Sequence, residues 1–423
     1  MFKKQLKIFL IVTLTLFGLG TLGLIIVNSL AGEPEKSIES DRQQFLSQFP
    51  DSPSNESAKE LEKLALRLGL DLVKMPDEEE AVISETQAFE EIKEELDKYL
   101  DGAVAQTSER IEPPPEKLQS YLQANAATLE ALSDYVLKEE TPQWEVDTTW
   151  IATGDLNAPL PSWIGLLNLE KILLLDALDK SRQGRNEEAI ARFAASWKIR
   201  QSLDGRPELI AQAVNAAILR LQGGVLRQFE EVPPEWQQRL VERDVIREMI
   251  TAIEAEFLFA YQAISSSDDW ELEGNEALFL KSPIGRTYVR WSAIDTYHSS
   301  SSLPPVLETS NVCSFDSEAI APSFQQPAWW NILGQIAQPS LSSQWERAGR
   351  IMLELELTQK ILQVKEMAAT AGKLPESLPN AESAVCPGYQ WVYEVSGDKS
   401  SLSLTPTPTL REDSKALPLV YYP

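Results

Sequence analysis

The sequence predicts a mainly α-helical protein with an N-terminal transmembrane helix, an array of α-helical hairpins and a small C-terminal β-hairpin packed on a helix. Three observations predict this fold class. Residues 8–27 form one long apolar run, apolar side chains recur at helical spacing along most of the chain, and clear strand-like alternation is confined to residues 389–404. The chain has 423 residues, of which 43% are hydrophobic and 24% charged, so its composition is that of a globular protein.

The N-terminal apolar run has the length of a membrane span. Its 20 residues extend roughly 30 Å as a helix, which is the thickness of a bilayer core. Lys3, Lys4 and Lys7 precede the run, so the positive-inside rule places the body of the protein outside the cytoplasm. A cleaved signal peptide is the alternative, because Ser29-Leu30-Ala31 has the small residues of a cleavage site. We expect a single-pass protein of the cell membrane whose C-terminal body is periplasmic or equivalent.

The remaining sequence divides into segments of different character. The expected segments are a cytoplasmic tip with the anchor (1–31), a polar tether (32–55), an acidic helical region (56–142), a helical-hairpin array (143–297), a Pro/Ser-rich loop region (298–343) and a long helix plus β-hairpin (344–423). Between Glu33 and Trp150 there are 29 acidic and 11 basic residues, a net charge of −18 within the −26 of the whole chain. This charge argues against a nucleic-acid partner, because a phosphate backbone requires a basic face.

Local signals place the helices. Ser57 and Glu60 have the spacing of a capping box, which predicts a helix start, and three prolines at 113–115 introduce another helix. In the array, we expect helices at about 163–178, 187–203 and 208–229 and one long helix at 235–264, with short turns between them.

One of these helical pairs resembles a known repeat. The stretch Gly184-x-x-x-Glu188-Ala189-Ile190-x-x-Phe193 resembles the second half of a tetratricopeptide unit. The resemblance covers about 30 residues and implies stacking of paired helices. The aromatic positions of the family's first helix are missing, and no second copy follows at a period of about 34 residues.

Prolines and serines interrupt regular patterns over residues 298–343, where Trp329 and Trp330 stand next to each other. A long irregular segment in a compact body is either functional or a covering layer. We favour the interpretation that the two tryptophans are buried packing anchors, and the alternative is that they form a platform for a ligand or partner.

The C-terminal segment combines a helix at 344–371, a Gly372 cap and two alternating strands. The order of Gly372-Lys373-Leu374-Pro375-Glu376-Ser377-Leu378, Cys386-Pro387-Gly388 and a strand pair resembles the C-terminal end of uncharacterised membrane-anchored bacterial envelope proteins. Type II pseudopilins have a related plan, but their N-terminal Gly–Phe cleavage site and glutamate are absent here. The resemblance implies an envelope protein and assigns no catalytic residue.

The sequence offers little for catalysis or for a cofactor. The single histidine is His298, and the sequence contains no G-x-S-x-G motif whose serine it could activate. One His and two Cys are too few ligands for the usual zinc sites. We therefore assign no catalytic, cofactor-binding or metal-binding residue. The most unusual carboxylates are Glu254 and Glu256 in an apolar stretch, with Asp244 upstream, and we expect them to pair with Arg243, Arg247 or backbone groups.

We accordingly expect a membrane-anchored interaction or scaffold module of the bacterial envelope, attached to the membrane through residues 8–27 and binding a protein partner. A carboxylate-based glycan hydrolase is the alternative, because the 64 acidic residues and 11 tryptophans supply the groups that such enzymes use.

The two cysteines, Cys313 and Cys386, allow only one intramolecular disulfide. Outside the cytoplasm such a bridge persists, and it would join the loop region to the base of the β-hairpin. The alternative is two buried free thiols.

Overall fold

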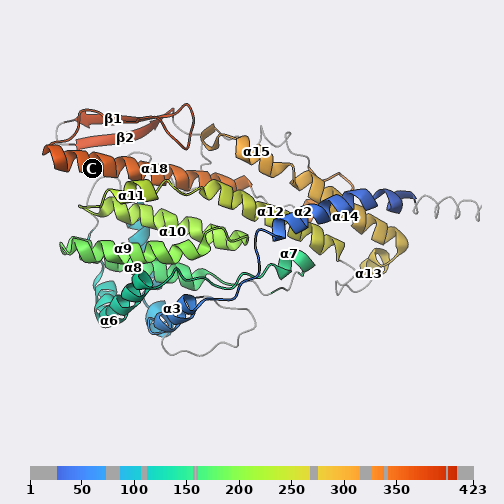
Figure 1. The fold of residues 1–423 in the computed structure, drawn as a ribbon, viewed down its shortest axis with the longest axis horizontal. Coiled ribbons are helices and arrows are strands. Elements are labelled where there is room, and N and C mark those ends of the chain that lie inside the picture. The colour runs from blue at the N-terminus through green and yellow to red at the C-terminus, as the bar shows by residue number, and fades with distance from the viewer. Residues whose placement is uncertain are drawn as a thin grey trace, which may run out of the picture.

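The computed structural model describes residues 26–72, 86–105, 112–155, 158, 161–266, 275–314, 326–337, 342–396 and 399–406. The predicted transmembrane helix therefore lies almost entirely outside the described residues. The body is mainly helical with one small antiparallel sheet near the C-terminus, and its long helices lie side by side (Figure 1).

The helices and strands have the following bounds. The first half of the body contains α2 (Gly32–Leu46), α3 (Glu56–Leu66), α4 (Thr86–Glu90), α5 (Lys93–Ala105), α6 (Glu116–Lys138), α7 (Thr149–Thr153), α8 (Ile164–Arg182), α9 (Asn186–Arg200), the 3-10 turn η1 (Gln201–Leu203) and α10 (Leu209–Gln228). The second half contains α11 (Glu235–Arg239), α12 (Val245–Ser265), α13 (Asn275–Leu280), α14 (Pro283–Ser300), α15 (Leu303–Thr309), the 3-10 turn η3 (Val312–Ser314), α17 (Ile332–Ala337), α18 (Ser342–Ala371), β1 (Gln390–Ser396) and β2 (Lys399–Thr405).

Helix α10 is the centre of the larger hydrophobic core, where it contacts α5, α8, α12 and α18. Most of its residues are buried, including four polar ones (Gln212, Asn215, Gln222 and Arg227), as expected for a helix surrounded by protein. Gly224 permits the close approach of α5, because a Cβ there would lie 2.6 Å from a methyl carbon of Val104. Within the described residues α10 is the one helix long and apolar enough to cross a membrane, and it is mostly buried in the body.

A second, smaller core joins α2, α7, the C-terminal half of α12 and α14. Helix α12 belongs to both cores: Met249 and Ile253 face the larger one, while Leu258 and Tyr261 face the smaller one. One continuous helix of 21 residues thus connects the two cores.

The predicted polar tether at 32–55 is wrong for most of its length, because residues 32–46 form α2. Its two buried side chains, Ile38 and Phe45, are seven residues apart and therefore lie on one face of the helix, which packs on the smaller core. Arg42 Nη1 also donates to the carbonyl of Ala152 at 2.9 Å. Tertiary packing therefore stabilises a helix whose composition is that of a linker.

Two predicted helix starts shift for the same physical reason. Asn55, not Ser57, caps α3 by accepting a hydrogen bond from the Ala58 amide at 2.9 Å, and Ser57 lies inside the helix. The long helix expected at 235–264 is divided, because the chain leaves helical geometry after α11 and Asp244 starts α12 by accepting from the Arg247 amide at 3.0 Å. Asn and Asp are among the strongest N-cap residues.

The expected loop region at 298–343 contains the end of α14 and two further helices, α15 and α17, among its described residues. Pro304 and Pro305 were expected to break regular structure, but they occupy the first turn of α15. In the first turn of a helix the backbone N–H groups have no partner within the helix. Proline, which lacks an N–H, is therefore well tolerated there.

The helix and the two strands predicted for the C-terminal segment are confirmed. Helix α18 ends at Ala371, and the next residue, Gly372, has a φ of 67° that suits a glycine cap. Strands β1 and β2 pair antiparallel with Trp391 opposite Leu404 and Tyr393 opposite Leu402. Trp391, Leu402 and Leu404 are buried in the larger core, so the apolar face of the hairpin covers the body as expected.

Candidate functional site

The two cysteines form one pair. The Cα atoms of Cys313 and Cys386 lie 5.8 Å apart and both residues are fully buried. This distance is inside the range of disulfides, so the distance that the predicted bridge requires is confirmed. Tyr389 Oη donates to the carbonyl of Cys313 at 3.2 Å, which ties the same two segments together a second time.

The two adjacent tryptophans do not share one environment. Trp329 is 88% exposed, so its interpretation as a buried packing anchor is wrong. Trp330 is half-buried, and its ring meets that of Tyr288 edge to face with centroids 6.3 Å apart. The exposed indole of Trp329 fits the alternative interpretation, a platform for a partner.

Of the pairings expected for the unusual carboxylates, the one between Asp244 and the backbone is present, because Asp244 accepts a hydrogen bond from the Arg247 amide. Arg243 forms ion pairs with Asp204 and Glu248 instead, while Asp244 serves as the cap of α12. Burial alone raises the pKa of Glu256 to about 7. His298 lies exposed on α14 rather than in a loop.

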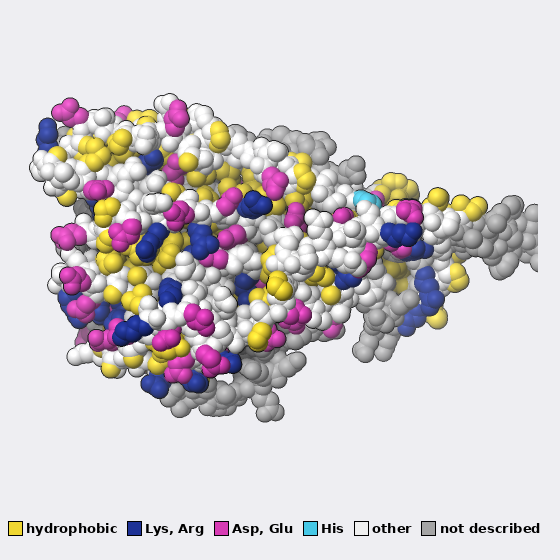
Figure 2. Space-filling view, viewed as in Figure 1, with side chains coloured by type: hydrophobic (Ala, Val, Ile, Leu, Met, Phe, Trp, Pro, Cys, Tyr) yellow, Lys and Arg dark blue, Asp and Glu magenta, His cyan; other side chains and the backbone are white. Residues whose placement is uncertain are grey.

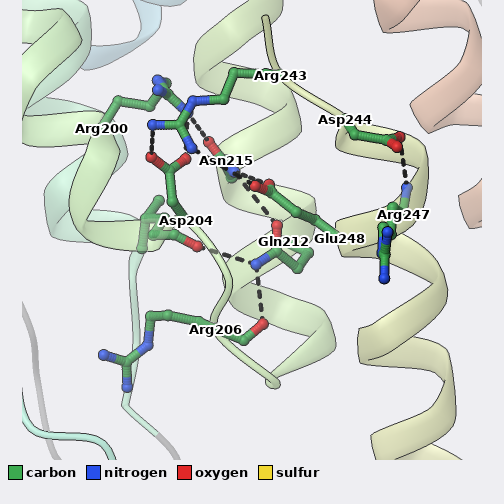
Figure 3. Close-up of polar contacts among 10 residues, drawn as sticks. Arg200, Asp204, Arg206, Gln212, Asn215, Arg243, Asp244, Arg247 and Glu248 are labelled. Atoms are coloured by element: carbon green, nitrogen blue, oxygen red, sulfur yellow. Dashed lines mark hydrogen bonds and ion pairs between the residues drawn. The ribbon is translucent and has the colours of Figure 1, made fainter. Parts of the chain in front are cut away.

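Arg243 belongs to a buried polar network (Figure 3). Arg200 at the end of α9 donates from Nη1 to Asp204 Oδ1 at 2.7 Å and to Asn215 Oδ1 at 3.1 Å. Asn215 in turn donates to Glu248 Oε2 at 3.2 Å. Two arginines face two carboxylates in this network, so the charges compensate one another and join the ends of α9, α10 and α12. We interpret it as a structural link between helices.

A cavity with largely apolar walls lies between α10, α12 and α18. It has a volume of about 310 Å³, at the lower end of the range for ligand pockets. Its lining comprises Ala213, Ala216, Ala217, Arg220, Met249, Gln344, Arg347, Arg350, Ile351 and Glu354. We call it the arginine pocket, because three guanidinium groups and one carboxylate accompany largely apolar walls. Its formal charge of about +2 contrasts with the net −26 of the chain.

Glu354 gives the arginine pocket its unusual chemistry. The residue is 1% exposed, and neither carboxylate oxygen accepts or donates a hydrogen bond. Arg220 Nε lies 3.9 Å from Oε2, close enough for an ion pair and too far for a hydrogen bond. Burial raises the pKa of Glu354 to about 7, although Arg227, Arg220 and Arg350 oppose this shift. A buried carboxyl group without hydrogen bonds is costly, and a ligand that supplies the missing partner would remove that cost.

The arginines and Glu354 together favour an anionic ligand. Arginine binds carboxylate and phosphate groups through two parallel hydrogen bonds, and a protonated Glu354 can add a further donor. The alanines, Met249 and Ile351 suit an apolar group attached to the anion. Among the described residues, no group of three or more His, Cys, Asp or Glu side chains could hold a metal ion.

The sequence did not identify this site. On α18, the side chains of Arg347, Arg350 and Glu354 are spaced by three and four residues, which places them on one helix face. Charged residues at that spacing, in a helix whose other residues are largely apolar, were the signal in the sequence that could have indicated a polar site. Arg220, on α10, is more than 120 positions earlier in the chain, so its presence beside them depends on the tertiary fold.

A separate pocket of about 350 Å³ lies between α2, α12, α14 and α15. It carries Asp41 and Glu254, and Tyr297 Oη donates to Asp41 Oδ2 at 3.1 Å. Burial, with a smaller contribution from Glu308, raises the pKa of Glu254. This pocket therefore combines two carboxyl groups in different environments.

Comparison with protein-family models, with curated proteins and with solved structures found no match for this chain. The tetratricopeptide resemblance of α8 and α9 and the resemblance to envelope proteins therefore receive no support beyond the residues that suggested them. Any function has to be argued from the sites themselves.

Proposed function

We propose that the chain is a membrane-anchored, extracytoplasmic interaction protein of the bacterial envelope that binds an anionic group of a partner protein in the arginine pocket. The apolar run at 8–27 and the lysines before it support the anchor and its orientation. The pairing of Cys313 with Cys386 supports an oxidising compartment. The stacked helices of the body are then a rigid scaffold that carries the pocket.

The single observation that carries the binding proposal is the state of Glu354. It is a buried carboxyl group without a hydrogen bond, in a pocket that also presents Arg220, Arg347 and Arg350. A volume of about 310 Å³ suits one acidic side chain or a chain terminus with a neighbouring apolar residue. Capture of a carboxylate by a preformed set of donors is a recurring mode of peptide recognition.

The test uses the full-length protein in detergent and two small probes. N-acetyl-leucine carries a carboxylate and an apolar side chain, whereas N-acetyl-leucinamide has the same side chain without the charge. We expect only the carboxylate to bind and to displace a co-purifying partner. The double variant Arg220→Gln/Arg347→Gln should weaken binding of N-acetyl-leucine at least about tenfold, because each charge-assisted hydrogen bond contributes roughly 1.5–3 kcal/mol.

Arg185→Gln is the control, because it makes the same Arg→Gln substitution once, in an exposed ion pair with Glu188 at the turn between α8 and α9. It should leave binding unchanged. Equal binding of both probes, or equal loss in the pocket variant and the control, would contradict the proposed site.

A second candidate function, a carboxylate-based glycan hydrolase, is favoured by the pocket that contains Asp41 and Glu254. Glycosidases use two carboxyl groups in one cleft as acid and base, and the acid has a raised pKa, as Glu254 does. This candidate predicts release of reducing ends from oligosaccharides and its loss in Glu254→Gln. Hydrolysis that survives this substitution, or no hydrolysis of a broad oligosaccharide panel, would exclude that role for the pocket.

A further inference from the structure

One end of the body exposes an unusual number of large apolar side chains. Among the described residues, the three most exposed large hydrophobic side chains are Trp329, Ile336 and Leu278, at 88%, 78% and 73% exposed. Ile332, Ile284 and Phe279 are also exposed. We call these six residues the apolar end surface. Exposure of so many large apolar groups is costly in water and marks an interaction site.

The N-terminal half of α14 holds this surface together. The ring of Tyr288 contacts those of Phe279 and Trp330, each with a centroid distance of 6.3 Å. Its hydroxyl accepts a hydrogen bond from the Ile332 amide at 3.2 Å. The two segments that carry the exposed side chains, 278–284 and 329–336, are therefore fixed to one helix rather than scattered over the molecule.

The same half of α14 binds the chain where the predicted membrane span ends. Asn28 Nδ2 donates to Thr287 Oγ1 at 3.1 Å, and Trp291 Nε1 donates to the carbonyl of Val27 at 3.3 Å. Arg290 pairs with Glu35 and donates from Nη1 to the carbonyl of Asn28 at 2.8 Å. The apolar run at 8–27 ends at Val27, so contact with the body begins at the last residue of the predicted span.

These contacts leave no flexible linker between the predicted span at 8–27 and the folded body. Because α2 replaces the expected tether, the chain is held to the body from the end of the apolar run onward. Figure 1 shows α13, α14 and the start of α2 at the same end of the molecule, opposite α6 and α9. Figure 2 shows hydrophobic side chains and Lys or Arg side chains gathered at that end. If residues 8–27 span a bilayer, the apolar end surface lies at its boundary.

We infer that the apolar end surface is inserted into the interface of the lipid bilayer that holds residues 8–27. This inference rests on the proposed anchor and adds a second membrane contact made by the folded body. Tryptophan favours the headgroup level of a bilayer, and amphipathic surfaces insert by about 5–10 Å. Lys281 and Arg286 are exposed beside the surface, between α13 and the first turns of α14, where they can face lipid phosphates.

The absence of free cysteines in the protein permits a site-specific test. The full-length chain is reconstituted in phosphatidylcholine vesicles with one introduced cysteine carrying an environment-sensitive fluorophore. The reporters of the surface are Leu278→Cys and Ile336→Cys, at positions so exposed that a label does not disturb the core. Leu137→Cys on α6, an exposed apolar position at the opposite end, is the matched control. Leu16→Cys reports on the anchor itself.

Lipids brominated near the headgroup end of the acyl chains should quench most of the fluorescence at positions 278 and 336 and none at 137. Lipids brominated near the chain ends should quench the label at position 16. Quenching at 16 without quenching at 278 and 336 would overturn this inference and leave the anchor intact. No quenching at 16 would overturn both the anchor and this inference.

A further control distinguishes lipid from protein as the occupant of the surface. If labels at 278 and 336 are shielded from aqueous iodide and are still not quenched by brominated lipid, a protein surface such as a second copy of the chain covers them. That result would also overturn the inference.

Discussion

At the scale of single residues, burial raises the pKa of several carboxyl groups. The pKa of Glu170 rises to about 8, and those of Glu248, Glu256 and Glu354 rise to about 7. Each group binds its proton more tightly in the folded chain than in the unfolded chain, where the ordinary value is 4.5. Their protonated forms therefore favour folding fully below about pH 4.5, and this stability is lost as the pH rises through 7 to 8.

Glu256 tests this pH dependence most simply, because burial is the sole cause of its shift. The substitution Glu256→Gln should raise the free energy of unfolding at pH 8 by roughly 3 kcal/mol and change it little at pH 4.5. Urea denaturation across this pH range measures the effect. Glu130→Gln, an exposed glutamate of α6, should leave the pH profile unchanged. If the free energy of unfolding of Glu256→Gln changes with pH in the same way as that of the unsubstituted protein, the raised pKa of Glu256 is contradicted.

Two glycines with similar backbone geometry make a second residue-scale comparison. Gly154 and Gly184 have φ of 67° and 76°, but a Cβ at Gly154 would lie 2.3 Å from the Ala263 amide nitrogen, whereas Gly184 faces open space. Gly184→Ala should cost about 1 kcal/mol from backbone strain alone. Gly154→Ala should cost roughly 2–4 kcal/mol, since α7 must also move away from α12. Equal losses in thermal or urea unfolding would show that close packing at Gly154 adds nothing.

At the scale of elements, helices with their own hydrophobic pattern could be predicted and helices formed by tertiary contacts could not. The apolar residues of α6, α8, α10 and α18 were sufficient to place them. Helix α2 has few apolar residues and depends on the core formed by α7, α12 and α14, so its sequence resembled a linker. The β-hairpin was predicted because strict alternation is a local signal.

The disulfide belongs to this scale because it joins η3 to the segment before β1. It closes a loop across a sequence separation of 73 residues. In the chain-entropy account, such a cross-link contributes on the order of 4 kcal/mol. The double variant Cys313→Ser/Cys386→Ser should lose stability of this order in guanidinium denaturation. Two alkylatable thiols in protein from its native compartment, or unchanged stability of the double variant, would refute the structural role.

At the scale of the whole molecule, the arginine pocket could not be predicted because its groups come from distant parts of the chain. Arg220 lies on α10, and Arg347, Arg350 and Glu354 lie on α18. The sequence shows that each helix carries charged residues, but it does not show that these residues lie beside one another in the fold. The two cores joined by α12 fix the distance between this pocket and the apolar end surface, since one helix borders the pocket and reaches the core beneath that surface.

The proposed function and the inferred membrane contact both require that the body lies outside the cytoplasm, attached directly to a membrane span. A dual reporter fused after Pro423 tests this most directly, with one enzyme active only outside the cytoplasm and one active only inside it. We expect the external reporter to be active and the fusion to stay with membranes after alkaline extraction. Activity of the cytoplasmic reporter alone, or release of the external fusion as a soluble protein that begins at Gly32, would contradict the account.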